Sequence, residues 1–121
     1  MRVVIQGDFP GLNEFIDANR RMNGKWSGGN EMKRRDQNII AYQLPRWHTS
    51  RPVFLEYTFY CKNRKRDKDN ISGYFHKVFQ DALVQRRVLD GDGWKHIEGF
   101  TDRFYVDSKT PRIEVDIKEV L

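Results

Sequence analysis

Hydrophobic side chains recur along the chain with two different periods, and these periods predict its helices and strands. The clearest helical pattern covers Ile71 to Leu83, where apolar residues recur every three or four positions without a gap. A weaker helical pattern starts at Leu12, and another covers about Glu31 to Gln43. The segment from Gly24 to Asn30 between these two is expected to be a loop.

Alternating apolar and polar residues predict four strands: Arg2 to Gln6, Val53 to Cys61, about Lys95 to Val106, and Arg112 to Val120. The predicted order is strand, two helices, strand, helix and two strands, with the last two strands forming a hairpin. This order indicates an α+β fold in which helices flank a mixed sheet. The length of 121 residues fits one domain spanning residues 1–121.

Composition narrows the range of functions. Lys and Arg outnumber Asp and Glu by 22 to 17, which gives a formal net charge of +5. A basic balance favours a polyanion such as nucleic acid as the partner, although a solvated cationic surface explains it equally well. The single cysteine, Cys61, excludes both an intrachain disulfide and a thiolate zinc site. With no signal peptide and no apolar run of membrane-spanning length, we expect a cytoplasmic protein that does not contact a membrane.

Three carboxylates suggest a site for a divalent metal ion. Asp67 and Asp69 are two positions apart between a predicted strand and helix, where an extended backbone points both side chains the same way. Asp92 follows that helix and reaches the same sheet edge if the next strand pairs nearby. Carboxylates without Cys or His partners suit Mg²⁺, with Mn²⁺ as a substitute. Each acid also has a plain structural explanation, because Asp69 or Asn70 suits a helix N-cap and Asp92 suits a polar turn.

Basic residues surround these acids and continue on neighbouring elements. Lys77 follows the acids on the predicted helix, where it either approaches a scissile phosphate or forms an ion pair with Asp81 four residues later. Other Lys and Arg residues are expected to contact the DNA backbone, because carboxylates alone repel phosphate. These residues are Lys62, Arg64, Lys65, Arg66, Lys68, Lys33, Arg34 and Arg35.

Two aromatic residues near these acids are also of interest. His76 projects from the flank of the predicted helix opposite Lys77, which suggests a surface or interface position. Trp94 lies beside Asp92 and is more typical of a core or dimer contact, but its position also makes it a residue to test for contact with DNA.

The motifs around these residues resemble those of a known family. The segments Arg66-Asp67-Lys68-Asp69-Asn70, Lys77-Val78-Phe79-Gln80-Asp81-Ala82-Leu83 and Val88-Leu89-Asp90-Gly91-Asp92 resemble the RusA-like Holliday junction resolvases. Two positions depart from the family pattern. Gly73 stands where the family lysine usually lies, so Lys77 is aligned with that lysine instead because its spacing to Asp81 fits the pattern. In the acidic turn, Asp92 is preferred to Asp90 because its spacing from Val88 fits better.

This resemblance implies a fold, an activity and roles for the residues. Members of the family are homodimeric, Mg²⁺-dependent endonucleases that place paired nicks across four-way DNA in recombination and repair, and many are encoded by prophages. The resemblance implies that Asp67, Asp69 and Asp92 bind the metal, that Lys77 is catalytically important, and that Asn70 shapes the start of its helix. No small-molecule cofactor is expected. Two other functions stay open: a nuclease for forks or flaps, and a nucleic-acid-binding module without catalysis.

Overall fold

The computed structural model describes residues 1–21 and 28–121. Its elements are β1 (Arg2–Ile5), α1 (Leu12–Arg21), α2 (Gly28–Tyr42), β2 (Val53–Cys61), α3 (Lys68–Gln85), β3 (Ile97–Val106) and β4 (Arg112–Glu119). The predicted order of elements is therefore confirmed, as is the α+β class with a mixed sheet. Several boundaries differ by a few residues, and one of them contradicts part of the predicted loop: α2 begins at Gly28, so residues 28–30 are helical. Residues 24–27 of the predicted loop lie outside the described residues.

The order of the strands across the sheet is β1-β4-β2-β3. β2 and β3 are parallel and are joined by α3, whereas β4 is antiparallel to both β2 and β1. The predicted hairpin between β3 and β4 is therefore wrong. A parallel crossover through a helix places β3 on one side of β2, and β4 then pairs with the other side, where Val115 and Ile117 are buried.

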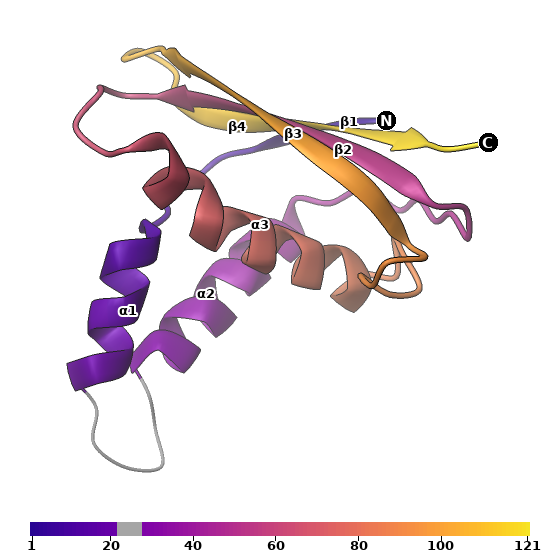
Figure 1. Ribbon diagram of the computed structural model, residues 1–121, viewed down its shortest axis with the longest axis horizontal. Coiled ribbons are helices and arrows are strands. Elements are labelled where there is room, and N and C mark those ends of the chain that lie inside the picture. Colours follow the sequence, from indigo (N-terminus) through magenta and orange to yellow (C-terminus); the bar gives the residue numbers. More distant parts are fainter. Residues whose placement is uncertain (22–27) are drawn as a thin grey trace.

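All three described helices cover the same face of the sheet (Figure 1). The core fills the space between these two layers. β2 contributes Val53, Leu55, Tyr57 and Phe59, which are buried at alternate positions as the period of two predicts. α3 contributes the predicted apolar stripe, whose buried members are Tyr74, Phe75, Val78, Phe79, Ala82 and Leu83.

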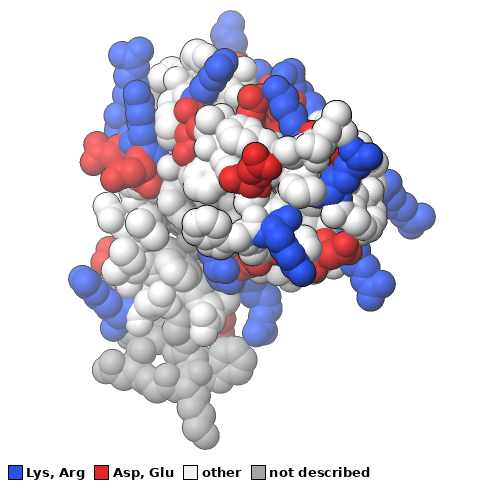
Figure 2. Space-filling model, turned by 45° about the vertical axis from the view of Figure 1, so that its right-hand side comes forward, with Lys and Arg blue, Asp and Glu red and all other residues white. Residues whose placement is uncertain are grey.

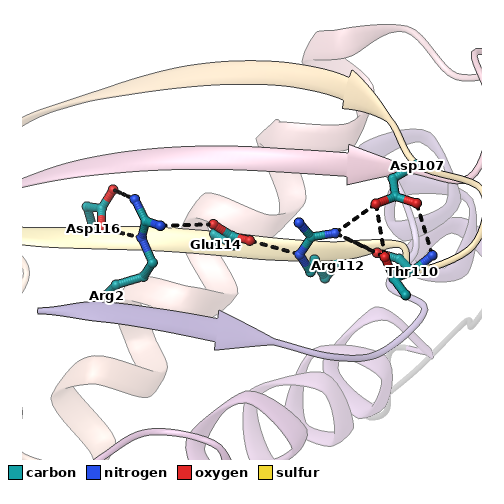
Figure 3. Close-up of polar contacts among 6 residues, drawn as sticks. All are labelled: Arg2, Asp107, Thr110, Arg112, Glu114 and Asp116. Atoms are coloured by element: carbon teal, nitrogen blue, oxygen red, sulfur yellow. Dashed lines mark hydrogen bonds and ion pairs between the residues drawn. The ribbon is translucent and has the colours of Figure 1, made fainter.

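The other face of the sheet carries a row of charged side chains (Figure 3). Arg2 pairs with Asp116 (2.9 Å) and lies 3.6 Å from Glu114, which also accepts a hydrogen bond from Arg112 (2.8 Å). Arg112 continues the row to Asp107 (3.0 Å). Hydrogen bonding to Arg2 holds the pKa of the Asp116 carboxyl below its usual value. Positive and negative groups therefore alternate along this face.

No helix among the described residues is both long enough and apolar enough to cross a membrane.

Candidate functional site

The segment between β2 and α3 carries a cluster of basic residues and is fastened to the N-terminal part of the chain. The Arg66 guanidinium donates a hydrogen bond to the carbonyl oxygen of Phe9 (2.9 Å) and lies 3.6 Å from the Glu14 carboxylate. Arg66 was expected to contact DNA, but in this structure its guanidinium fixes the loop. The neighbouring Lys62, Arg64 and Lys65 are exposed. This arrangement leaves three cations beside the start of α3.

Asp67 and Asp69 both lie at the N-terminus of α3. Asp67 is the N-cap residue, with an extended backbone (φ −67°, ψ 152°), but its carboxylate makes no capping hydrogen bond. The prediction that Asp69 or Asn70 is the N-cap is therefore wrong. Asp69 lies in the first turn of the helix, where the helix dipole favours a negative charge. Both carboxylates are exposed and remain available to a ligand.

Asn70 was expected to shape the start of its own helix, α3. In the structure its side chain instead contacts the start of α1. Its Oδ1 accepts a hydrogen bond from the backbone N–H of Asn13 (2.8 Å), which belongs to the first turn of α1. The approach is close, because a Cβ added at Gly11 would lie 2.5 Å from the Asn70 Nδ2. Asn70 therefore couples the start of α3, with its two carboxylates, to the start of α1.

A surface hollow opens beside these carboxylates, between the N-terminus of α3 and the C-terminal ends of β2 and β3. Its lining contains acidic, basic and apolar side chains from two stretches of the chain, 61–71 and 104–106: Cys61, Asn63, Arg64, Arg66, Asp67, Lys68, Asp69, Ile71, Phe104, Tyr105 and Val106. Lys68 extends over the Phe104 ring, 5.9 Å from its centroid. Cys61 is half-buried at the hollow, and burial raises the pKa of its thiol, so the thiol stays neutral. The hollow is therefore a mixed-charge pocket open to solvent.

Asp92 lies at the other end of the molecule from Asp67 and Asp69. The 18 residues of α3 separate them, and a helix of that length extends about 27 Å. Figure 1 shows the loop that precedes α3 and the loop that precedes β3 at opposite ends of the helix. The predicted meeting of three carboxylates does not occur within one chain. Among the described residues, no three His, Cys, Asp or Glu side chains are grouped to hold a metal ion.

The turn at Asp92 is itself well defined. The backbone N–H groups of His96 and Ile97 both donate to the carbonyl oxygen of Gly93 (3.0 Å each), which holds Asp92 close to the first residue of β3. Asp90 is engaged by His48 (2.9 Å), and this hydrogen bond lowers the Asp90 pKa. Both acids are exposed, but the Asp90 carboxylate is already hydrogen-bonded to His48.

Lys77 lies on a different side of α3 from the hollow. It follows Asp69 by eight residues, which places it about 12 Å along the helix and roughly 80° around it. Its Nζ donates to Asp81 (3.3 Å), and Lys33 of α2 lies 2.6 Å from the same carboxylate. Burial raises the Asp81 pKa, but the two lysines outweigh it and the net shift is downward. The alternative in which Lys77 forms an ion pair with Asp81 therefore describes this structure.

The remaining basic residues predicted to contact DNA divide between two regions. Arg64 and Lys68 line the hollow, and the exposed Lys62 and Lys65 belong to the same segment between β2 and α3. Arg34 and Arg35, in contrast, lie on the exposed side of α2. Arg35 also approaches the buried Asp36 (3.5 Å). Figure 2 shows basic and acidic side chains interspersed on the face that it displays. The positive charge nearest the two carboxylates is therefore that of the segment between β2 and α3.

The contribution of β3 to the hollow was not predicted from the sequence. Phe104, Tyr105 and Val106 line the hollow because β3 is parallel to β2 and ends beside it. If residues 53–106 are interpreted as a strand–helix–strand unit with parallel strands, β3 is predicted to end beside β2. The expected hairpin between β3 and β4 led away from this interpretation.

His76 and Trp94 have contrasting environments. His76 is a half-buried partner of Asp102 on β3 (2.7 Å), and its ring packs against Tyr57 and Phe100. Trp94, in contrast, is fully exposed, so the expectation that it belongs to the core is wrong, whereas a dimer or DNA contact stays a prediction.

Comparison of the chain with models of known protein families and with curated proteins gave no match.

Proposed function

We propose that this protein is a Mg²⁺-dependent endonuclease that acts on branched DNA, with the four-way junction as its substrate, as its resemblance to the RusA-like resolvases implies. One observation carries the proposal. Asp67 occupies the N-cap position of α3 without capping it, so its carboxylate and that of Asp69 both remain exposed beside a hollow edged by basic residues. A purely structural capping role for this acidic motif does not account for that arrangement.

The residues at the hollow fit a hard divalent cation. Mg²⁺ is usually held by one or two carboxylates and completes its coordination with water and substrate phosphate oxygens. Asp67 and Asp69 would hold the ion. When bound, it would supply an activated water and stabilise the charge on the phosphoryl oxygens. Arg64, Lys65 and Lys68 would attract the DNA backbone, which the two acids alone repel.

Lys77 takes a secondary role in this proposal. Its Nζ is hydrogen-bonded to Asp81 and lies on another side of α3, so it would contact the backbone of a bound DNA arm instead of the reacting phosphate. The same reasoning applies to Lys33, which shares the Asp81 carboxylate. Both lysines would then contribute mainly to affinity.

The experiment measures Mg²⁺-dependent cleavage of a synthetic immobile four-way junction, a fork and a linear duplex, with the products mapped on each strand. We expect the wild type to nick the junction. Asp69→Asn should lose at least about 100-fold in rate, since it removes one of two metal ligands, while junction binding persists because the change removes a negative charge. The matched control is Glu31→Gln, which removes a carboxylate from the first turn of α2.

The outcomes distinguish three functions. Preferential nicking of the fork identifies a nuclease for other branched DNA. Binding of the junction without nicking of any substrate, with Mg²⁺ or Mn²⁺, identifies a binding module and contradicts the proposal. Equal cleavage by Asp69→Asn and wild type contradicts the assignment of the metal ligands.

A further inference from the structure

A second pocket lies beside the loop between β2 and α3, toward β4, whereas the hollow with Asp67 and Asp69 lies toward β3. Four segments line it: the loop between β1 and α1, the end of β2 with the loop that follows, the first turns of α3, and the start of β4. Figure 1 shows these segments at one end of the molecule. The volume of the pocket is about 110 Å³. It therefore holds several water molecules or one small ring system, but not a drug-sized ligand.

The floor of this pocket is aromatic and fixed by packing. Phe9, Phe59 and Phe75 line it, and all three side chains are buried. Their rings pack edge to face, with centroids 5.4 Å apart for Phe9 and Phe75 and 5.7 Å apart for Phe59 and Phe75. Water beside apolar rings has few hydrogen-bond partners, so a flat apolar group that displaces it gains affinity. The floor is therefore suited to an aromatic ring.

The rim of the pocket offers one cation to an anionic group. Arg66 and Arg112 both line the pocket but are engaged, because Arg66 donates to the Phe9 carbonyl oxygen and Arg112 is bound by two carboxylates. Lys62 is exposed, and no residue that the structure describes forms an ion pair with it. Its ammonium group has three N–H donors. Lys62 is therefore placed to bind a single phosphate.

Two short polar side chains add hydrogen-bonding groups to the same pocket. Asp8 lies in the loop between β1 and α1, and its carboxylate is an acceptor. The Asn63 Oδ1 already accepts a hydrogen bond from the backbone N–H of Lys65 (3.0 Å), which leaves the Asn63 amide nitrogen as a donor. An acceptor together with a donor matches the pairing edge of a base that has an amino group. Thymine has no amino group to donate to Asp8.

We propose that this pocket binds one nucleotide, with its base on the aromatic floor and its phosphate at Lys62, and that it favours bases with an amino group over thymine. The nucleotide is either free or an unpaired nucleotide of DNA, whose base leaves the stack to enter the pocket. Asn63 and Arg66 line both the pocket and the hollow, so a DNA strand can place a base in one and a neighbouring phosphate at the other. That link to DNA rests on the proposed nuclease function, whereas the nucleotide pocket itself does not.

A titration of the ¹⁵N-labelled protein with dGMP, dCMP, dTMP and inorganic phosphate tests the pocket through its amide chemical shifts. We expect dGMP and dCMP to shift the amides of Asp8 and Asn63. Both should bind at least about 5-fold more tightly than dTMP, because their amino groups reach the carboxylate. Inorganic phosphate should bind at least about 5-fold more weakly than dGMP, because it has no base. Equal affinities for dGMP and dTMP, equal affinities for dGMP and inorganic phosphate, or no shift at these amides overturns the inference.

Two variants assign the contacts to base and phosphate. Asp8→Asn replaces an acceptor by a group that both accepts and donates, so we expect similar affinities for dGMP and dTMP. Lys62→Ala should weaken all three nucleotides at least about 5-fold without changing their order. The matched controls are Asp17→Asn on α1 and Lys109→Ala between β3 and β4, since neither residue lines the pocket. Equal effects of a variant and its control contradict the assigned contact.

Single-stranded DNA separates the two sources of the nucleotide. A short oligonucleotide is compared with one that contains abasic positions, in the absence of divalent cations. If the source is DNA, dGMP displaces the intact oligonucleotide, and the abasic one binds at least about 5-fold more weakly. If dGMP binds the pocket without displacing the oligonucleotide, the source is a free nucleotide. Nucleotide binding by a protein that nicks no branched substrate supports the pocket and instead refutes the proposed nuclease function.

Discussion

At the scale of single residues, polar groups buried inside the molecule are paired with specific partners. Asp36 of α2 is almost fully buried, and its carboxylate accepts a hydrogen bond from the Tyr74 hydroxyl of α3 (2.6 Å). Burial, reinforced by the Asp36 carboxylate, raises the pKa of the Tyr74 phenol, so this hydroxyl stays protonated and remains a donor. No buried side-chain nitrogen or oxygen within the described part of the chain lacks a hydrogen-bond partner.

The Tyr74–Asp36 pair gives a prediction about stability. Tyr74→Phe keeps the ring packing but removes the hydroxyl that donates to the buried carboxylate. We expect the free energy of unfolding to fall by about 2 kcal/mol, as is typical for loss of a hydrogen bond to a buried charged group. Urea denaturation measures this change, and Tyr42→Phe, on a highly exposed side chain, is the control. Equal unfolding midpoints for the two variants contradict this account of the pair.

At the scale of secondary-structure elements, the position of the two carboxylates depends on how α3 is anchored. Asn70 hydrogen-bonds to the first turn of α1, and Arg66 reaches the Phe9 carbonyl that precedes α1. These two contacts hold the loop between β2 and α3 from both sides. These contacts therefore join the start of α1 to the start of α3, whose residues line the hollow.

Substitution of Asn70 tests this coupling. Asn70→Ala removes the acceptor for the Asn13 N–H and is expected to lower the free energy of unfolding by about 1 kcal/mol, similar to the loss of an N-cap. Asn70→Asp keeps an oxygen acceptor in the same position and should retain most of the stability. Thermal or urea unfolding of both variants makes the comparison. If the two substitutions lower the free energy of unfolding equally, the hydrogen bond from Asn13 to Asn70 does not stabilise the fold as proposed.

The elements themselves were largely predictable from the sequence, because their signals are local. The apolar stripe of α3 and the alternation in β2 each depend on a single element, and both predictions are confirmed. The partner of β4 was not predictable in this way. Its alternation of Ile113, Val115 and Ile117 with charged residues satisfies any antiparallel neighbour, so the pattern does not distinguish β3 from β2.

At the scale of the whole molecule, the strand order decides which candidate residues meet. Asp67 is the N-cap of α3 and Asp69 lies in its first turn, so sequence proximity alone brings them together. The position of Asp92 depends on where β3 lies in the sheet. The parallel pairing of β2 and β3 sends the beginning of β3 to the end of the sheet far from the hollow.

The central claim is that Asp67 and Asp69 hold a divalent cation at a surface that binds DNA. The most direct measurement is a Mn²⁺ titration followed by electron paramagnetic resonance, with the protein saturated by a four-way junction. We compare the wild type with the Asp67→Asn, Asp69→Asn double variant, which is expected to bind the junction at least as well. The account predicts one additional tightly bound Mn²⁺ per chain in the wild type. Identical Mn²⁺ binding by the two proteins would contradict it.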